Sequence, residues 1–420
     1  MKKRMNAAVL CIVLLLSILL NLSGCGITAQ AEDLMSGIKA NSVSTNIDIA
    51  GKDATAVMDF AVRLFQQSVE DGSNTLISPL SVLCALAMTA NGARGETLSQ
   101  MEEVFGLSVE ELNEYLYICT NSLPDGDKSK LKIANSIWFK DDDSFTVEPN
   151  FLQANADYYG AGLYKAPFDS STLSDINNWV NKNTDGMIQD ILGSIPEEAV
   201  MYLVNALAFD AEWMKNYDKI QVRDMVFTKE DGTEQETELM YSEENQYLKD
   251  TNAVGLLKYY VGKNYAFAAL LPDEGISVTE YVASLTGEKL AEILSNSEDV
   301  KVSAAIPKFK SEYSVELSEV LRAMGMTDAF NYNTSDFSGI GYSTDGYLYI
   351  NRVLHKTFIE VDEKGTKARA VTAVGVGTAA GSVIVEEIKI VHLDRPFVYM
   401  LIDCEENFPI FIGTVMDVSN

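Results

Sequence analysis

AVMYLVNALAF occupies residues 199–209 and is apolar apart from Asn205, with little alternation of polar and apolar side chains. A strand with one face in water alternates, whereas a strand covered on both faces reads as a nearly continuous apolar run. This stretch therefore predicts a strand in the middle of a large sheet.

Helices are expected mainly before this strand and further strands mainly after it. Apolar residues recur at helical spacing near the start of the domain, and Ser78-Pro79 gives an N-cap followed by proline at the first helical position. This order argues for a single α+β domain with large mixed sheets. The expected helices are 54–69, 80–90, 96–105, 172–192, 278–294 and 315–324, and the further strands are 132–140, 255–261, 265–271, 302–309, 348–362, 388–393, 396–402 and 410–415.

The N-terminus carries an export signature. Basic residues 2–4 precede an apolar run over 7–22, which is too short for a confident membrane-spanning helix and ends in Leu22-Ser23-Gly24-Cys25. This ending resembles the bacterial lipobox, whose cysteine becomes lipidated after signal removal; a plain signal peptide or an uncleaved anchor is the alternative. The expected organisation is a lipoprotein signal peptide over 1–24, a lipidated tether over 25–50 with lipidation at Cys25, and a domain over 51–420. The protein would then be an extracellular, cell-surface lipoprotein of a bacterium.

Charge and composition exclude several classes of function. The formal net charge of −29 repels nucleic acid and anionic lipid surfaces, so we expect no nucleic-acid partner and membrane contact only through the lipid anchor. Cys84, Cys119 and Cys404 are an odd number at unrelated spacings, which favours buried free thiols over a disulfide framework.

Catalytic signatures are missing from the chain. Its two histidines, His355 and His392, cannot form a His-rich metal site, and neither is near a convincing nucleophile. No GxSxG elbow, phosphate loop or HExxH pair occurs. We therefore expect no enzyme, no catalytic residues, no metal and no cofactor.

Motifs along nearly the whole domain, from about residue 52 to 417, resemble those of the serpin family. Each motif is weak alone, but their joint occurrence in this order is specific. They are Asn74-x-x-x-Ser78-Pro79-x-Ser81, Ala85-Leu86-Ala87-Met88 with Gly92-Ala93-x-Gly95-x-Thr97, Ala134-Asn135-Ser136, Ile176-Asn177-x-Trp179-Val180 with Thr184-x-Gly186, Leu203-Val204-Asn205-Ala206, Leu271-Pro272, Ile306-Pro307-Lys308-Phe309, Asp336-Phe337-Ser338-Gly339, His355-Lys356, Glu363-x-Gly365-Thr366 and Asp394-Arg395-Pro396-Phe397.

The resemblance implies a serpin fold: three β-sheets, with a large central mixed sheet A, about nine helices and an exposed reactive-centre loop over about 363–387. It also implies a monomer that inhibits serine proteases as a suicide substrate. A gating cluster of polar residues would control opening of the central sheet, and Trp213 and Glu363 would mark the mouth where the loop enters. The implied gating residues are Ser78, Ser81, Asn205, His355 and Trp213, although His355 also fits a plain buried histidine.

The loop itself is suited to insertion as a strand. Side chains alternate between the two faces of a strand, so those facing the core must be small and uncharged. With Thr366 as the first inward position, the inward set contains no charge, whereas Lys367 and Arg369 fall on the outward face. A one-residue slip would bury both charges, so only one register is permitted. The hinge is Glu363, Gly365, Thr366, Ala368 and Ala370, and the inward set continues with Thr372 and Val374. A flexible surface loop with no mechanical role is the alternative.

Counting about seventeen residues from Glu363, as in the family, places the reactive bond at Ala379-Ala380, with Thr378-Ala379 as the neighbouring alternative. The stretch from Ala380 to Pro396 is longer than is common in the family, which leaves Val383 or Ile384 as later positions. Small residues before the bond suit elastase-like or subtilisin-like serine proteases, which have shallow primary pockets. Two rival functions are a non-inhibitory serpin acting as a cell-surface binding protein and a hydrolase that uses one of the histidines.

Overall fold

A seven-stranded mixed sheet forms the centre of the computed structural model, which describes residues 31–45, 51–124, 126, 128–142, 145–342, 348–366 and 388–419. Its strand order is β1-β5-β3-β6-β15-β14-β12. The bounds are β1 Glu32–Asp33, β3 Ser129–Lys140, β5 Gly162–Ala166, β6 Met201–Glu212, β12 Phe309–Glu316, β14 Arg352–Val361 and β15 Gly365–Thr366. Residues 201–209 of β6 are all buried, which confirms the prediction of a central strand.

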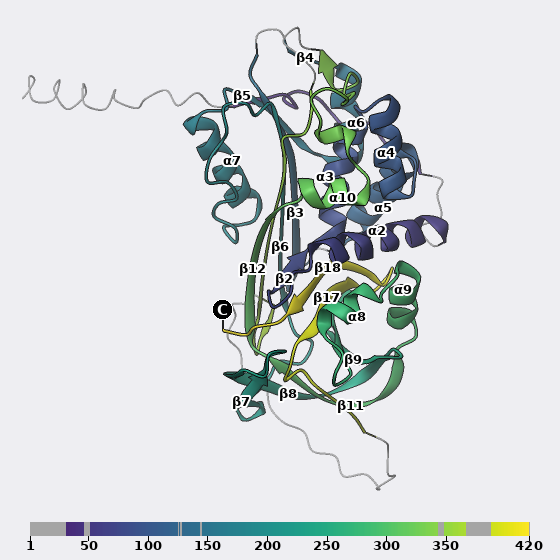
Figure 1. Ribbon diagram of the computed structural model, residues 1–420, viewed down its shortest axis with the longest axis vertical. Helices are drawn as coiled ribbons and strands as arrows, with labels where there is room; N and C mark the ends of the chain where they lie inside the picture. Colours follow the sequence, from purple (N-terminus) through teal and green to yellow (C-terminus); the bar gives the residue numbers. More distant parts are fainter. Residues whose placement is uncertain are drawn as a thin grey trace, which may run out of the picture.

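A second, nine-stranded sheet packs against the lower end of the central sheet (Figure 1). Its order is β16-β11-β8-β9-β10-β17-β18-β2, with β7 pairing to β8. The bounds are β2 Thr75–Ile77, β7 Val222–Thr228, β8 Glu234–Lys249, β9 Ala253–Tyr259, β10 Tyr265–Pro272, β11 Glu298–Pro307, β16 Lys389–His392, β17 Phe397–Asp403 and β18 Phe408–Val415. A third sheet joins β4 (Thr146–Val147) to β13 (Gly341–Tyr342).

Helices cover the two faces of the central sheet unequally (Figure 1). One helix, α7, lies on one face above a small apolar cluster, and the larger core lies between the opposite face and most of the other helices. The described residues contain nine α-helices: α2 Lys52–Ser68, α3 Pro79–Ala90, α4 Gly95–Phe105, α5 Val109–Ser122, α6 Pro149–Tyr159, α7 Ser170–Asn183, α8 Val278–Ala283, α9 Gly287–Ser295 and α10 Ser318–Met324. Two 3₁₀ turns are η1 Lys219–Gln221 and η2 Asp328–Phe330. None of the helices in the described part of the chain is both long and apolar enough to span a bilayer.

Three of the expected helices have different boundaries in the structure. The helix expected to reach residue 192 ends at Asn183, because Asp185 and Gly186 adopt left-handed backbone angles there. The helix expected over 278–294 is two helices, and Thr286 caps the second by accepting a hydrogen bond from the backbone N–H of Lys289. Strand β12 reaches Glu316, so the helix expected from residue 315 begins at Ser318.

Residues 31–45, which belong to the expected tether, lie against the domain. Strand β1 pairs antiparallel with β5 at the edge of the central sheet, and Leu34 and Met35 pack on the main core. Asn41 is bound by Asp157 of α6 through both its backbone N–H and its side-chain amide. The signal peptide, Cys25 and the remaining tether residues lie outside the described part of the chain, so the predictions for them stay open.

Candidate functional site

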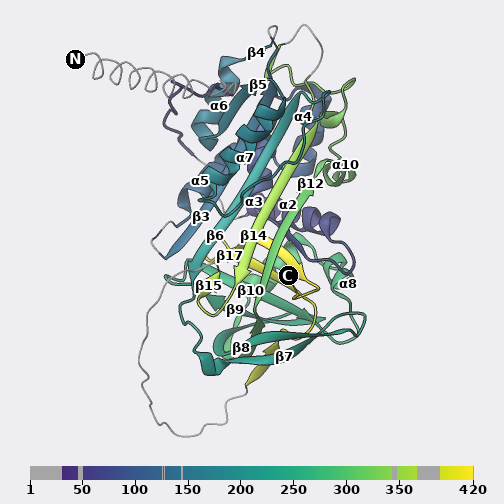
Figure 2. The same cartoon turned by 90° about the vertical axis from the view of Figure 1, so that its left-hand side faces the viewer.

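The hinge of the expected reactive loop is already part of the central sheet. Strand β15 lies between β6 and β14 at one end of the sheet and is antiparallel to both (Figure 2). Thr366 pairs with Ala211 on one side and with Val361 on the other, and its side chain is fully buried. Gly365 is required by close packing, since an added Cβ would lie 1.9 Å from the carbonyl oxygen of Ala211.

Three aromatic residues, Trp213, Tyr217 and Tyr260, hold this hinge; we call them the aromatic clamp. The indole Nε1–H of Trp213 donates to the carbonyl of Asp362 at 2.8 Å, and its backbone N–H donates to the carbonyl of Lys364 at 2.8 Å. The backbone N–H of Tyr217 donates to the carbonyl of Glu363 at 2.9 Å. Every carbonyl of the turn from 362 to 364 therefore has a partner from the clamp.

Tyr260 connects the clamp to the first inward residue of the loop. Its ring stacks on Trp213 with centroids 4.4 Å apart and planes 14° apart. Its hydroxyl lies 2.6 Å from Oγ1 of Thr366, and both groups are buried. Burial raises the pKa of Tyr260 well above its ordinary value, so the hydroxyl stays protonated and can donate.

A surface ion pair closes the outer side of the hinge. Nζ of Lys308 lies 3.0 Å from carboxylate oxygens of both Glu363 and Glu238. Burial opposes the ionised form of Glu363, but a backbone hydrogen bond and Lys308 together hold its pKa below the ordinary value. The pair is partly exposed, so its contribution to stability is small.

Beyond the hinge, β6 and β14 pair directly with each other. This contact, which we call the seam, is parallel and runs over seven positions from Arg352–Tyr202 to Phe358–Ala208. Parallel ladders are slightly less stable per residue than antiparallel ones. The sheet is thus already parted at one end by two residues and held along the rest by its weaker kind of pairing.

A buried polar cluster lies beneath the seam: Ser78, Ser81, Asn135, Asn205 and His355. His355 and Asn205 are direct seam partners, and their side chains are hydrogen-bonded through Nδ1 and Oδ1. The amide nitrogen of Asn205 donates to the carbonyl and hydroxyl of Ser81 and to Oδ1 of Asn135. The hydroxyl of Ser78 caps α3 by accepting from the backbone N–H of Ser81. The amide of Asn205 thus connects β6 to helix α3 and to both neighbouring strands, β3 and β14.

The protonation state of His355 follows from its partners. Burial lowers its pKa to about 3, so the ring is neutral at physiological pH. Nε2 accepts the backbone N–H of Ser78 at 3.1 Å, which leaves the proton on Nδ1 to be donated to Asn205. The ring therefore acts as a neutral bridge between α3 and the seam.

The expected gating residues fall into two places. Ser78, Ser81, Asn205 and His355 are in contact, whereas Trp213 belongs to the clamp. It directly follows the end of β6 and is eight residues from Asn205, or about 26 Å at strand spacing. Asn135 was missed as a cluster member although its motif was noted, because its role depends on pairing with Asn205 across β3 and β6. Tyr217 and Tyr260 had no sequence signal beyond being aromatic.

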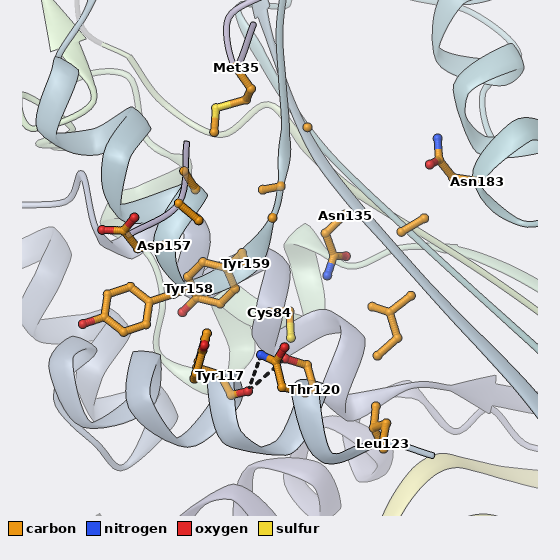
Figure 3. Close-up of a pocket in the computed structure, with 18 of the residues that line it drawn as sticks. Met35, Cys84, Tyr117, Thr120, Leu123, Asn135, Asp157, Tyr158, Tyr159 and Asn183 are labelled. Atoms are coloured by element: carbon orange, nitrogen blue, oxygen red, sulfur yellow. Dashed lines mark hydrogen bonds between the residues drawn. The ribbon is translucent and has the colours of Figure 1, made fainter. Parts of the chain in front are cut away.

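A pocket of about 770 Å³ lies beside the polar cluster, between β3, α5, α6 and residues 33–41 (Figure 3). Asn135 extends from the strand side toward Cys84 of α3, and Tyr159 lies on the opposite wall. The Tyr159 hydroxyl is bonded to Asn113, and its burial raises its pKa well above the ordinary value. The hollow therefore adjoins the strand β3 without offering an ionised group from this tyrosine.

Other candidate reactive groups are unsuited to nucleophilic chemistry. Cys84, Cys119 and Cys404 are free thiols, and burial raises the pKa of Cys119 and of Cys404 to about 12. His392 lies on the edge strand β16, where Nε2 is 3.5 Å from the Ser303 hydroxyl. The described residues contain no group of three potential metal ligands.

Several expected site residues lie outside the described part of the chain. They are the hinge residues Ala368 and Ala370, the bond residues Thr378, Ala379 and Ala380, and the lipidation site Cys25. Their assignments stay predictions.

Known proteins resemble the chain over almost its whole domain. The family model described as "Serpin (serine protease inhibitor)" matches residues 55–418. A serpin-like protein of Thermococcus kodakarensis is 30% identical over 370 residues, which cover 86% of this chain and 85% of that protein. The leukocyte elastase inhibitor of Xenopus laevis is 31% identical, with coverage of 83% and 94%.

Solved structures agree with the sequence matches. The native state of tengpin, a thermophilic serpin, has a TM-score of 0.88 and 52% identity, with coverage of 93% of this chain and 100% of that chain. The latent state of tengpin has a lower TM-score of 0.78, with 48% identity and coverage of 90% and 100%. The match to the family model over residues 55–418, together with these relatives and structures, shows that the chain belongs to the serpin family.

Proposed function

We propose that this protein inhibits serine proteases as a suicide substrate, by inserting its cleaved loop into the seam. The observation that carries the proposal is β15, a two-residue strand already seated between β6 and β14 with Thr366 facing the core. An inserting loop needs only to lengthen this strand. A surface loop with no mechanical role would not require the sheet to be parted at its base.

The register of β15 supports insertion along the whole seam. Thr366 pairs with Ala211 and Val361, and extending both antiparallel ladders brings residue 372 opposite Asn205 on one side and His355 on the other. Asn205 and His355 are themselves seam partners, so the two ladders agree at this position. The inward residue there is Thr372, whose hydroxyl is the right chemistry to meet the polar cluster.

Insertion would exchange one parallel ladder for two antiparallel ladders. Each inserted residue gains backbone partners on both sides, and the seam loses only its direct pairing. The uncleaved protein is then a metastable state that relaxes once the loop is cut. About sixteen inserted residues at roughly 3.3 Å each would carry an attached protease some 50 Å.

The chemistry is an ordinary acyl transfer that is stopped half-way. The protease serine oxygen attacks the carbonyl carbon of Ala379, the bond to the nitrogen of Ala380 breaks, and that nitrogen leaves as a new amine after receiving the serine proton through the protease's base. Water would normally hydrolyse the remaining ester. Insertion must therefore displace and distort the protease before water reacts.

The target class is argued from the bond and from one relative. Small residues at 376–379 suit proteases with shallow primary pockets, such as elastase-like and subtilisin-like enzymes. A 31% identical relative is named a leukocyte elastase inhibitor, which supports the same class. Trypsin-like enzymes are expected to be poor targets, because residues 370–388 contain no lysine or arginine.

We further propose that the inhibitor acts outside a bacterial cell, attached through a lipid on Cys25. The lipobox-like residues 22–25 support this location. Replacing Cys25 by Ala should release the protein from the membrane fraction, and mass spectrometry of the wild-type N-terminus should find a diacylglyceryl group. An N-terminus without this modification would contradict the proposal.

Incubation with an elastase, followed by a denaturing gel, tests inhibition directly. A covalent band at the summed mass, together with loss of protease activity, is the expected result. Complete conversion to a clipped protein with undiminished protease activity would overturn the proposal and favour a non-inhibitory binding protein. Sequencing the released C-terminal fragment locates the bond, with Ala380 expected at its N-terminus.

A further inference from the structure

A buried lysine, Lys258, lies directly behind the aromatic clamp. It belongs to β9, and its side chain is 2% exposed. Its Nζ donates to Oε1 of Glu244 at 2.7 Å, and the same oxygen accepts the hydroxyl of Ser242 at 2.7 Å. A buried ion pair costs desolvation of both charges and is weak evidence of a stabilising role. Its position therefore calls for another explanation.

The ammonium of Lys258 also faces two of the three clamp rings. It lies 4.4 Å from the ring centroid of Tyr217 and 5.3 Å from that of Trp213. Both distances are within the range of cation–π attraction, which is stronger for desolvated cations than for exposed ones. The Tyr217 hydroxyl reaches the same network, 3.3 Å from Oγ of Ser242. Glu244 thus fixes the cation, and the cation fixes the two rings.

Those two rings belong to the residues that hold the hinge. Trp213 binds the carbonyls of Asp362 and Lys364, and Tyr217 binds the carbonyl of Glu363. Through these bonds the position of Lys258 is transmitted to the turn that starts β15. Burial lowers the pKa of Lys258 and Glu244 opposes this effect.

We infer that Lys258 is a positioning residue for loop insertion: it sets the clamp so that the hinge enters the sheet in the correct register before any protease arrives. The inference rests on the proposed inhibitory function and adds a residue to it. When the end of an inserting strand is not fixed, ordering that end costs conformational entropy before any pairing forms. When the first residue is already paired in the sheet, each following residue can pair without that cost. Insertion must outrun hydrolysis of the ester, so loss of the preset pair diverts the reaction toward clipped, inactive inhibitor.

The test replaces Lys258 by Met, which keeps the length of the side chain without the charge. Lys289→Met is the matched control. Lys289 likewise pairs with a carboxylate, that of Asp250 at 2.8 Å, and lies over an aromatic ring, that of Tyr281, but it is far from the hinge. We expect Lys258→Met to raise the number of inhibitor molecules clipped per protease trapped by about three- to tenfold. The rate at which the protease first attacks the loop should not change, and Lys289→Met should behave as wild type.

Two further variants keep the test decisive. Lys258→Met leaves Glu244 buried without its partner, so Lys258→Met/Glu244→Gln removes both charges and should show the same diversion if the cation on the rings is what matters. Lys258→Arg keeps a cation that can stack and should restore most of the trapping. If the double variant traps protease with the wild-type number of clipped molecules per trapped protease, the inference is wrong and the proposed function stands. Absence of any trapped protease with the wild type overturns the proposed function instead.

Discussion

The two neighbours of β6 are attached to it in opposite ways. β3 pairs antiparallel with β6 over eleven positions, from Ser129–Ala211 to Phe139–Met201, without interruption. β14 pairs parallel over seven positions and is displaced at the hinge end by β15. Both contacts bury the same strand, yet only the β14 side is parted at one end. Under the proposed function, this comparison favours the β14 side for insertion, because its ladder is parallel and already parted at one end.

The polar cluster also distinguishes the β3 contact of β6 from its β14 contact. Asn205 bonds across the β3 side to Asn135 and across the β14 side to His355, so its side-chain amide faces both contacts. In the proposed insertion, opening of the seam would break the side-chain bond from Asn205 to His355 and would leave the bond from Asn205 to Asn135 in place. The hydroxyl of the inserted Thr372 would then lie beside the side chains of Asn205 and His355, which have lost their bond to each other.

Replacing Thr366 by Arg is expected to have the largest effect. The guanidinium would have to enter the fully buried position beside Tyr260, at a cost of several kcal/mol, so trapping should fall by at least about 100-fold while clipping continues. Denaturing gels of samples quenched at successive times, together with residual protease activity, measure the ratio of trapped to clipped inhibitor.

Val371→Arg is the matched control, because it places the same charge on the outward face of the loop. It should trap protease as wild type does. Equal inhibition by the Thr366 and Val371 variants would contradict the assigned register.

The pH dependence of stability should expose the buried His355. Its pKa is lowered to about 3 when folded against about 6.5 when unfolded, so only the unfolded chain takes up a proton between these values. Stability is therefore full above about pH 6.5 and falls as the pH drops, by about 2 kcal/mol between pH 7 and 5. Denaturant unfolding of uncleaved wild type and His355→Gln at both pH values measures the difference. Equal losses in the two proteins would contradict a neutral, buried ring.

Thr372→Val tests the extended register with a smaller effect. The change removes the hydroxyl that the proposed insertion would bring to the polar cluster, so the cleaved, inserted form should lose about 1 kcal/mol more stability than the uncleaved form. Chemical unfolding of both forms gives the two values. An equal change in both forms would place Thr372 elsewhere.

Glu363→Gln should have the smallest effect. The bridge to Lys308 is partly exposed, with side chains 26% and 38% exposed, so its loss should cost less than about 1 kcal/mol and should vanish at high salt. Thermal unfolding at low and high ionic strength measures this. A large, salt-independent loss would show that the ion pair does more than close the surface of the hinge.

Much of the architecture could be predicted because it depends on local pattern. The continuous apolar run at 199–209 identified the central strand, and capping at Ser78-Pro79 placed a buried helix correctly. Elements with weaker periodicity were missed, among them α5, α6 and the long polar strand β8. β8 has exposed glutamates at several positions because much of its length lies at the surface, so it lacks the apolar signal of a core strand.

The residue pattern by itself predicted the candidate site only where it follows the alternation of one strand, whereas Ser78, Ser81, Asn205, His355 and Trp213 were expected from the family resemblance. Thr366 takes the inward position that period two assigns to it, because pleating fixes the side of each residue. Tyr217 and Tyr260 contact the hinge, and Lys258 contacts the ring of Tyr217, through pairings that join distant parts of the chain. No spacing in the sequence encodes such contacts, so they needed the three-dimensional structure.

Two engineered disulfides that share one residue test the central account most directly. Ala206 pairs with Lys356 across the seam and with Ala134 across the β3 side, so each pair of cysteines would link adjacent strands at a distance that a disulfide can span. Oxidised Ala206→Cys/Lys356→Cys should be clipped by an elastase without trapping it, and reduction should restore the covalent complex. The Ala134→Cys/Ala206→Cys variant should trap the protease both when oxidised and when reduced. Undiminished trapping by the oxidised 206–356 variant would show that the loop does not enter between β6 and β14.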